Sequence, residues 1–208
     1  MTGIIDFNAG NITSLERSLD YLKIKYISSK NPEELKDCDK FIFPGDGDDS
    51  YAMNQLKASG FDDFVKKQVA DGKKLLGICV GSQIIFEKTE EGNAACLGLV
   101  EGNIRHFYSI EPGMKEQKIK VPQIGWNNIT FENGDCQILK GVQNNSDVYF
   151  VHSYVICPTC KSVVKAYTEY GIKVPAVIQK DNIFACQFHP EKSGQTGLKI
   201  IENFCNLT

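Results

Sequence analysis

The stretch Leu75-Leu76-Gly77-Ile78-Cys79-Val80-Gly81-Ser82-Gln83 decides how this chain is expected to fold. Its first four residues form a short apolar run that is typical of a buried strand, and residues 80–87 carry apolar side chains at helical spacing. Cys79 therefore lies at the joint between a strand and a helix. Gly77 and Gly81 permit the unusual backbone angles and close packing of a sharp turn. Such a joint would hold a cysteine nucleophile at a helix N-terminus, which favours the thiolate.

A second fragment, far along the chain, supplies the groups that such a nucleophile needs. Phe188-His189-Pro190-Glu191 follows a strand-like run at 182–187. Cysteine catalysis requires an imidazole that moves protons, and a carboxylate can fix the tautomer of that imidazole. Taken alone, Cys79 would most simply be a buried thiol and His189 a core histidine. The flanking glycines and the pairing of His189 with Glu191 favour catalysis instead.

Working outward, strands and helices alternate through the first part of the chain. Strands are expected at 3–7, 25–28, 39–43 and 75–78, and helices at 11–22, 32–37 and 61–71. This alternation is typical of a mainly parallel sheet covered by helices on both faces.

After Gly98 the pattern changes to strands separated by turns. Strands are expected at 103–107, 127–131, 148–156, 162–169, 174–179 and 182–187, followed by a last helix at 194–207. The sequence therefore predicts an α/β fold with an added antiparallel sheet. Because no repeat or low-complexity linker interrupts it, we expect one domain over residues 1–208.

Composition bounds the class of protein. The chain has 208 residues, of which 42% are hydrophobic and 24% charged, and a formal net charge of -3 without a basic patch. We therefore expect no nucleic-acid partner. No apolar run approaches the length of a membrane span and the start does not resemble a signal peptide, so we expect no membrane association and a cytosolic location. Reduced thiols are the better interpretation of the eight cysteines.

Several motifs together resemble a known family. Gly-Ile-Cys-Val-Gly-Ser-Gln with the distant His-Pro-Glu resembles the class I, or triad, glutamine amidotransferases. Within that family the chain is most similar to the glutaminase subunits of imidazole glycerol phosphate synthase. The motifs that carry this narrower resemblance are Asp6-Phe7-Asn8-Ala9-Gly10-Asn11, Val121-Pro122-Gln123-Ile124-Gly125-Trp126-Asn127, Tyr149-Phe150-Val151-His152-Ser153-Tyr154 and Phe188-His189-Pro190-Glu191-Lys192-Ser193.

The resemblance implies a flavodoxin-like fold, an activity and a partner. Cys79 would attack the side-chain amide of L-glutamine and form a glutamyl thioester, with His189 moving protons and Glu191 orienting His189. Ammonia would pass to a (β/α)8-barrel cyclase or synthase subunit in a heterodimer, which makes imidazole glycerol phosphate in histidine biosynthesis. No cofactor and no metal are implied.

The resemblance also assigns further residues. The oxyanion hole would use backbone amides at Gly45 and Val80. The remaining assignments are substrate binding by Gly47, Gln83, Ser153 and Tyr154, and partner contact or coupling by Asn11, Gln123, Trp126 and Lys192.

Two positions depart from the family pattern. Asp46 stands where a small apolar residue is usual, and Gln123 stands where a histidine is usual. These departures leave an alternative acceptor open, a surface-polysaccharide sugar that a paralogous enzyme pair would amidinate. A non-catalytic binding subunit with a relic triad and a cysteine peptidase on a similar sheet are further alternatives. The intact triad speaks against the relic, and Gln83 and the Trp126 segment speak against the peptidase.

Three other features have competing interpretations. Cys157 and Cys160 have the spacing of a zinc pair or a redox dithiol, but no second pair accompanies them, so a plain turn is favoured. His152 lies in an alternating strand, where packing is as plausible as substrate or interface contact. Trp126, between a glycine and two asparagines, suggests an exposed turn at an interface.

Overall fold

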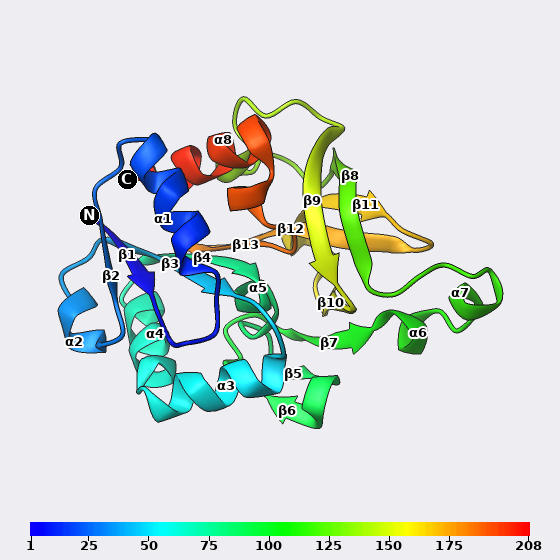
Figure 1. Ribbon diagram of the computed structural model, residues 1–208, viewed down its shortest axis with the longest axis horizontal. Coiled ribbons are helices and arrows are strands. Elements are labelled where there is room, and N and C mark those ends of the chain that lie inside the picture. Colours follow the sequence, from blue (N-terminus) through cyan, green and yellow to red (C-terminus); the bar gives the residue numbers. More distant parts are fainter.

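Two sheets and eight α-helices make up the computed structural model, which describes residues 1–208 (Figure 1). The strands are Thr2–Ile5 (β1), Tyr26–Ser29 (β2), Lys40–Gly45 (β3), Lys74–Cys79 (β4), Lys88–Thr89 (β5), Ala94–Ala95 (β6), Gly102–His106 (β7), Gln123–Phe131 (β8), Ser146–His152 (β9), Tyr154–Pro158 (β10), Val164–Glu169 (β11), Lys173–Lys180 (β12) and Ile183–Cys186 (β13). The helices are Ile12–Tyr21 (α1), Pro32–Leu35 (α2), Asp49–Ala58 (α3), Phe61–Ala70 (α4), Val80–Gln83 (α5), Phe107–Ile110 (α6), Gly113–Glu116 (α7) and Gly194–Cys205 (α8). Four 3-10 turns lie at Glu91–Asn93 (η1), Gln137–Leu139 (η2), Lys161–Val163 (η3) and Pro190–Lys192 (η4).

The large sheet has nine strands in the order β2-β1-β3-β4-β13-β12-β11-β8-β9. Its first five strands are parallel and the remaining four are antiparallel. The strand that carries Cys79 therefore lies directly beside β13, whose register pairs Ala185 with Gly77. A smaller sheet, in the order β10-β7-β5-β6, lies next to it. The α/β class is confirmed, with most of the antiparallel strands continuing the main sheet.

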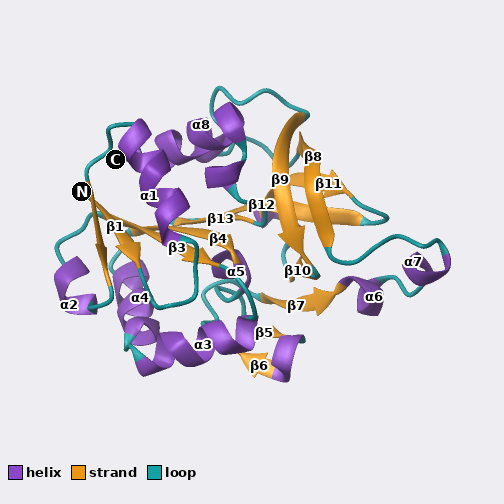
Figure 2. Cartoon of the chain, in the orientation of Figure 1, coloured by secondary structure: helices purple, strands orange, loops and turns teal.

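Helices cover both faces of the parallel half (Figure 2). Along β4, Leu75 packs into the core under α3 and α4, whereas the next residue, Leu76, packs into the core under α1 and α8. Successive side chains of a strand point to opposite faces, so a continuous apolar run is what a sheet buried on both sides requires. The alternating strand β9 instead buries Val148, Phe150 and His152.

Local sequence sets the ends of several elements. The side chain of Asn11 accepts the Ser14 N–H at the start of α1, and Asp48 does the same for Tyr51 at the start of α3. Near the C-terminus, the carbonyl oxygens of Cys205 and Leu207 accept hydrogen bonds from the buried ammonium group of Lys40. That contact satisfies carbonyl groups that the end of α8 leaves free.

The structure corrects some expected boundaries. The helix after Cys79 was expected to span residues 80–87 but ends after one turn, at Gln83. The single strand expected at 148–156 is two strands in different sheets that break at Ser153. Trp126 lies within β8 and not in a turn. Helix α3 was missed because its apolar face is short and follows an acidic loop.

No helix in the chain combines the length and the apolar character that crossing a membrane requires.

Candidate active site

A strained turn holds Cys79 between β4 and α5. Its backbone has φ 51° and ψ -111°, a conformation that residues other than glycine rarely adopt. The turn depends on close backbone packing around Gly81, where an added Cβ would lie 1.9 Å from the carbonyl oxygen of Phe43. A Cβ on Gly77 would lie 2.6 Å from the Gly81 oxygen. Gly77 and Gly81 therefore have no room for a side chain, which agrees with the close packing expected from the sequence.

The loop after β3 packs against the same turn. A Cβ on Gly45 would lie 2.6 Å from the Gly81 nitrogen and 2.7 Å from the Val80 Cβ. The backbone of Gly45 thus lies beside the first turn of α5, whose leading N–H groups have no partner within the helix. Gly45 and Val80 are brought together, as an oxyanion hole at this point requires.

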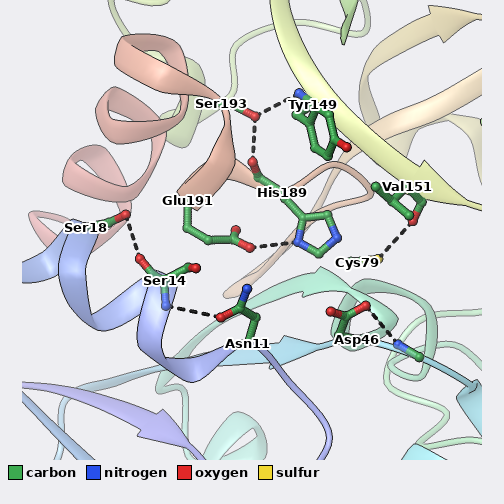
Figure 3. Close-up of polar contacts among 11 residues, drawn as sticks. Asn11, Ser14, Ser18, Asp46, Cys79, Tyr149, Val151, His189, Glu191 and Ser193 are labelled. Atoms are coloured by element: carbon green, nitrogen blue, oxygen red, sulfur yellow. Dashed lines mark hydrogen bonds and ion pairs between the residues drawn. The ribbon is translucent and has the colours of Figure 1, made fainter. Parts of the chain in front are cut away.

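Cys79, His189 and Glu191 meet at one end of the sheet (Figure 3). The His189 Nδ1 is 2.7 Å from Glu191 Oε1, and the two side chains are 2% and 4% exposed. The Cys79 thiol contacts the carbonyl oxygen of Val151 at 3.6 Å. Because β4 and β13 are neighbouring parallel strands, the residues that follow their C-terminal ends lie at the same edge. The sheet therefore positions the thiol beside the imidazole.

The environment of His189 favours its charged form. Burial alone would lower the pKa of His189, but its contacts with Cys79 and with the Glu191 carboxylate outweigh burial and raise the pKa to about 10. The two contacts therefore favour the imidazolium form of His189 over the neutral ring. A protonated ring is ready to give a proton to a leaving group.

A second set of hydrogen bonds fixes the main chain of His189. Its N–H donates to the Tyr149 carbonyl oxygen at 2.9 Å. Ser193 is buried, donates from Oγ to the His189 carbonyl oxygen at 2.6 Å and accepts the Tyr149 N–H at 3.0 Å. The turn η4 is thereby fastened to β9 (Figure 3).

The Cys79 side chain borders a pocket of about 200 Å³. The residues lining it come from both halves of the fold: Asp46, Gly47, Cys79, Val80, Gln83, Glu91, Pro122, Val151, His152, Ser153 and Tyr154. All four residues expected to bind substrate are among them. Larger hollows of about 530 and 730 Å³ lie elsewhere on the surface but contain none of the triad.

The loop from Asp46 to Gly47 has its amides engaged. The Asp46 N–H donates to the Ala9 carbonyl oxygen at 3.2 Å, and the Gly47 N–H donates to Asp46 Oδ1 at 3.0 Å. Gly47 has φ +96° and open space around it. A further oxyanion donor from this loop would require a peptide to turn away from these partners.

The sequence matches a family model described as "Glutamine amidotransferase class-I" over residues 3–207. The chain belongs to the class I glutamine amidotransferases. Among curated proteins, this amidotransferase is 46% identical to "Imidazole glycerol phosphate synthase subunit HisH" of Methanocaldococcus jannaschii, over the full length of both chains. It is 40% identical to the Bacillus subtilis protein of the same name, covering 100% of this chain and 96% of the relative.

Solved structures share the fold of the amidotransferase. One described as "Crystal structure of glutamine amidotransferase" has a TM-score of 0.74 at 18% identity and covers 98% of both chains. "Structure of PurLQS from Thermotoga maritima" has a TM-score of 0.72 at 18% identity, covering 99% of this chain and 97% of that one. At this identity the likeness concerns the fold alone.

The residues expected at a partner interface of the amidotransferase fall into two groups. Trp126 is 58% exposed on β8 and lies 6.0 Å, ring to ring, from Tyr149. Lys192 is half-buried and follows Glu191 in the sequence. Asn11 caps α1 through its side-chain oxygen, and its amide nitrogen points toward Glu191 (Figure 3). The Gln123 side chain is instead buried and turned inward. Their roles with a partner stay predictions.

Sequence reasoning missed one carboxylate in the pocket of the amidotransferase. Glu91 lies in η1 and lines the pocket with Cys79, while its Oε2 accepts the Asp49 N–H at 2.7 Å. In the sequence Glu91 belongs to a charged run that resembles a solvated surface, so no local signal marks it. Only the packing of η1 against the start of α3 brings it to the pocket.

Asp49, beside Glu91, is a buried acid. It is 0% exposed, Thr89 donates to its Oδ2 at 2.7 Å, and its Oδ1 has no partner. Burial raises the pKa of Asp49 from 3.8 to about 7, and the nearby charges of Glu91 and Asp48 add to the rise. Folding therefore favours the neutral acid. The stability that this preference contributes is complete below about pH 4 and is lost as the pH rises through 7.

Replacing Asp49 with asparagine should remove this pH dependence. Between pH 5 and pH 8 the free energy of unfolding of the wild type should fall by about 2–3 kcal/mol more than that of Asp49→Asn. Urea denaturation of both proteins at the two pH values measures the difference. Asp63→Asn, which changes an exposed carboxylate on α4, serves as the control and should follow the wild type. Parallel curves for wild type and Asp49→Asn would contradict the buried-acid assignment.

Proposed function

We propose that this chain is the glutaminase subunit of an imidazole glycerol phosphate synthase, acting as one domain in a heterodimer with a (β/α)8-barrel cyclase subunit. It hydrolyses L-glutamine to glutamate and ammonia, and the ammonia reaches the cyclase without entering bulk solvent. The observation that carries the chemistry is the buried contact of His189 with both Cys79 and Glu191. The acceptor is inferred from the full-length similarity to subunits named HisH.

The residues act in a fixed order. The Cys79 thiolate attacks the side-chain carbonyl carbon of glutamine, and the negative charge passes to the carbonyl oxygen beside Val80 and Gly45. The carbon–nitrogen bond then breaks, and His189 gives its proton to the departing ammonia. Water attacks the resulting thioester while His189 takes a proton from it. Glutamate leaves and the Cys79 thiolate returns.

The pocket also supplies groups suited to the other end of glutamine. Glu91 offers a carboxylate to the α-ammonium group, and Gln83 together with the backbone of Ser153 and Tyr154 offers hydrogen-bonding groups. A glutamine molecule held at both ends presents its amide carbon to the Cys79 sulfur. Asn11, Trp126 and Lys192 are proposed to lie at or near the interface with the cyclase. Gln123 is buried and would affect that interface only indirectly, from the interior of this subunit.

Complementation tests the acceptor. The chain, expressed in a Bacillus subtilis strain whose own HisH subunit has been deleted, together with its cognate cyclase, should restore growth without histidine. Purified protein should also be labelled at Cys79 by the glutamine analogue diazo-oxonorleucine. Labelling without rescue would favour the surface-sugar acceptor, and absence of labelling with the cyclase present would exclude the glutaminase.

Asp46 is expected to restrain the isolated subunit. Its carboxylate occupies the Gly47 N–H, so Asp46→Ala frees that amide for the oxyanion. We expect glutamine hydrolysis by the isolated chain to rise about three- to tenfold, the value of one hydrogen bond. Asp46→Asn retains an acceptor oxygen and is the matched control. Equal rates for the two variants would contradict this role.

A further inference from the structure

A buried chain of hydrogen bonds connects the exposed strand β8 with the pocket. Gln123, the first residue of β8, has its amide oxygen Oε1 at 3.1 Å from His152 Nε2, and His152 Nδ1 contacts the Tyr154 carbonyl oxygen at 2.7 Å. The Gln83 amide nitrogen donates to the same carbonyl at 3.0 Å and to Gln187 Oε1 at 3.0 Å. The four side chains are between 0% and 6% exposed. These side chains are therefore almost wholly excluded from bulk water, whereas Tyr154, which supplies only its carbonyl oxygen, is half-buried.

The carbonyl at the centre of this chain fixes the tautomer of His152. A carbonyl oxygen can only accept, so Nδ1 of His152 must carry the hydrogen that the Tyr154 oxygen receives. Burial is the main reason that the pKa of His152 falls to about 4. The hydrogen bond to Tyr154 raises this pKa, and the nearby charge of His189 lowers it further. The ring is neutral at physiological pH, so its Nε2 accepts. An Oε1 that faced an accepting Nε2 would bring two acceptors together and leave the buried Gln123 Nε2 without a partner, so the two ends of the Gln123 amide exchange places and its NH₂ end donates to the ring.

The same logic orients Gln83. Both hydrogens of its amide nitrogen are used, one on the Tyr154 oxygen and one on Gln187. The amide oxygen of Gln83 is therefore the end left for the pocket, where it can accept an N–H group of the substrate. If the Tyr154 carbonyl moved, the amide could rotate and present a donor instead.

We propose that Gln123 and His152 are positioning residues: they hold the Tyr154 carbonyl and thereby orient the Gln83 amide with its oxygen toward glutamine. The proposal rests on the proposed glutaminase function. Strand β8 begins at Gln123 and also carries the exposed residues Ile124 and Trp126. The hydrogen bonds from Gln123 therefore link this exposed strand to the pocket. A protein bound on this strand would act on substrate binding through the buried chain.

Kinetics of the complete complex test the positioning role. Gln123→Met removes the donor to His152 at similar volume, and we expect the KM for glutamine to rise about tenfold, the effect of one buried hydrogen bond, while kcat stays within about twofold. Asn127→Leu is the control, because it removes a side-chain hydrogen bond, to the Glu169 carbonyl oxygen, from the same strand. It should leave both constants unchanged. An unchanged KM in an active Gln123→Met complex, or an equal loss in the control, would overturn the proposal.

Nuclear magnetic resonance of the free wild-type chain gives a second readout that needs no activity. The sequence has three histidines, so selective ¹⁵N labelling of imidazoles yields three sets of ring signals. His152 should be neutral, with the hydrogen on Nδ1, throughout pH 6 to 8, and Gln123→Met should shift its Nε2 signal. A hydrogen on Nε2 or a doubly protonated ring at pH 7 would overturn the proposal even if the variant does not fold. Absence of glutaminase activity in the wild-type complex would overturn the proposed function itself.

Discussion

Replacing Cys79 with alanine is expected to abolish glutamine-dependent synthesis by the complex and to leave synthesis from added ammonium salts intact. The thiol forms the covalent bond to the substrate, so its loss should lower glutamine hydrolysis by at least about 10⁴-fold. Under the proposed function the cyclase subunit has its own active site, and free ammonia can replace the ammonia that the glutaminase supplies. Parallel assays of product formation with glutamine and with ammonium salts measure both rates.

A second cysteine provides the control for this experiment. Cys205 lies at the end of α8, away from the pocket, and Cys205→Ala should retain glutamine-dependent activity. Circular dichroism and co-purification with the cyclase verify folding and assembly of both variants. Loss of the ammonia-dependent rate in a folded Cys79→Ala complex would contradict the assignment of ammonia release and ammonia use to different subunits. Substantial glutaminase activity in that variant would exclude Cys79 as the nucleophile.

Gly81→Ala should destabilise the fold severely. The new methyl carbon would lie 1.9 Å from the Phe43 carbonyl oxygen, a separation that no rotamer relieves because both partners are backbone or backbone-attached atoms. Relief requires β3 and the turn at Cys79 to move apart, which disrupts the sheet centre. We expect a loss of at least about 4 kcal/mol in the free energy of unfolding, above the usual range for overpacking. Urea denaturation measures it.

Gly113→Ala is the matched control for that substitution. An added Cβ at Gly113 meets only the flexible carboxylate of Glu111, at 2.9 Å, which can turn away. We expect a change within about 1 kcal/mol. A small effect of Gly81→Ala would mean that the close contact between β3 and the turn at Cys79 is absent in solution.

Much of the fold and of the triad could be predicted from the sequence because both depend on local signals. An apolar run with glycines in it and after it located β4 and the cysteine at its end, and a second apolar run, at 183–186, located β13 and the His189 segment that follows it. Since the two strands are neighbours in a parallel sheet, their C-terminal ends had to meet. The short α5 was mispredicted because apolar residues 84–86 continue the helical spacing, whereas their side chains fill the core in an irregular segment.

The contributions of Glu91, Ser193 and Gln187 could not be predicted in the same way. Each acts through a contact with a residue remote in the sequence or in another element: Glu91 with Asp49, Ser193 with Tyr149, and Gln187 with Gln83. Periodicity and motif spacing say nothing about such pairs. The inward orientation of Gln123 likewise follows from the pairing of β8 with β9, whose register places Gln123 opposite His152.

The placement of Cys79 at the end of β4, and of His189 three residues after the adjacent β13, has a consequence for how such a subunit can change its task. Two hydrogen-bonded strands, β4 and β13, set the spacing between Cys79 and the segment that leads to His189, whereas Ile124 and Trp126 on β8 are exposed at the surface. The exposed side chains of β8 can therefore change without altering the strands that carry the triad. Under the proposed function, replacing these exposed side chains would fit the subunit to a different recipient of its ammonia while β4 and β13 stay as they are.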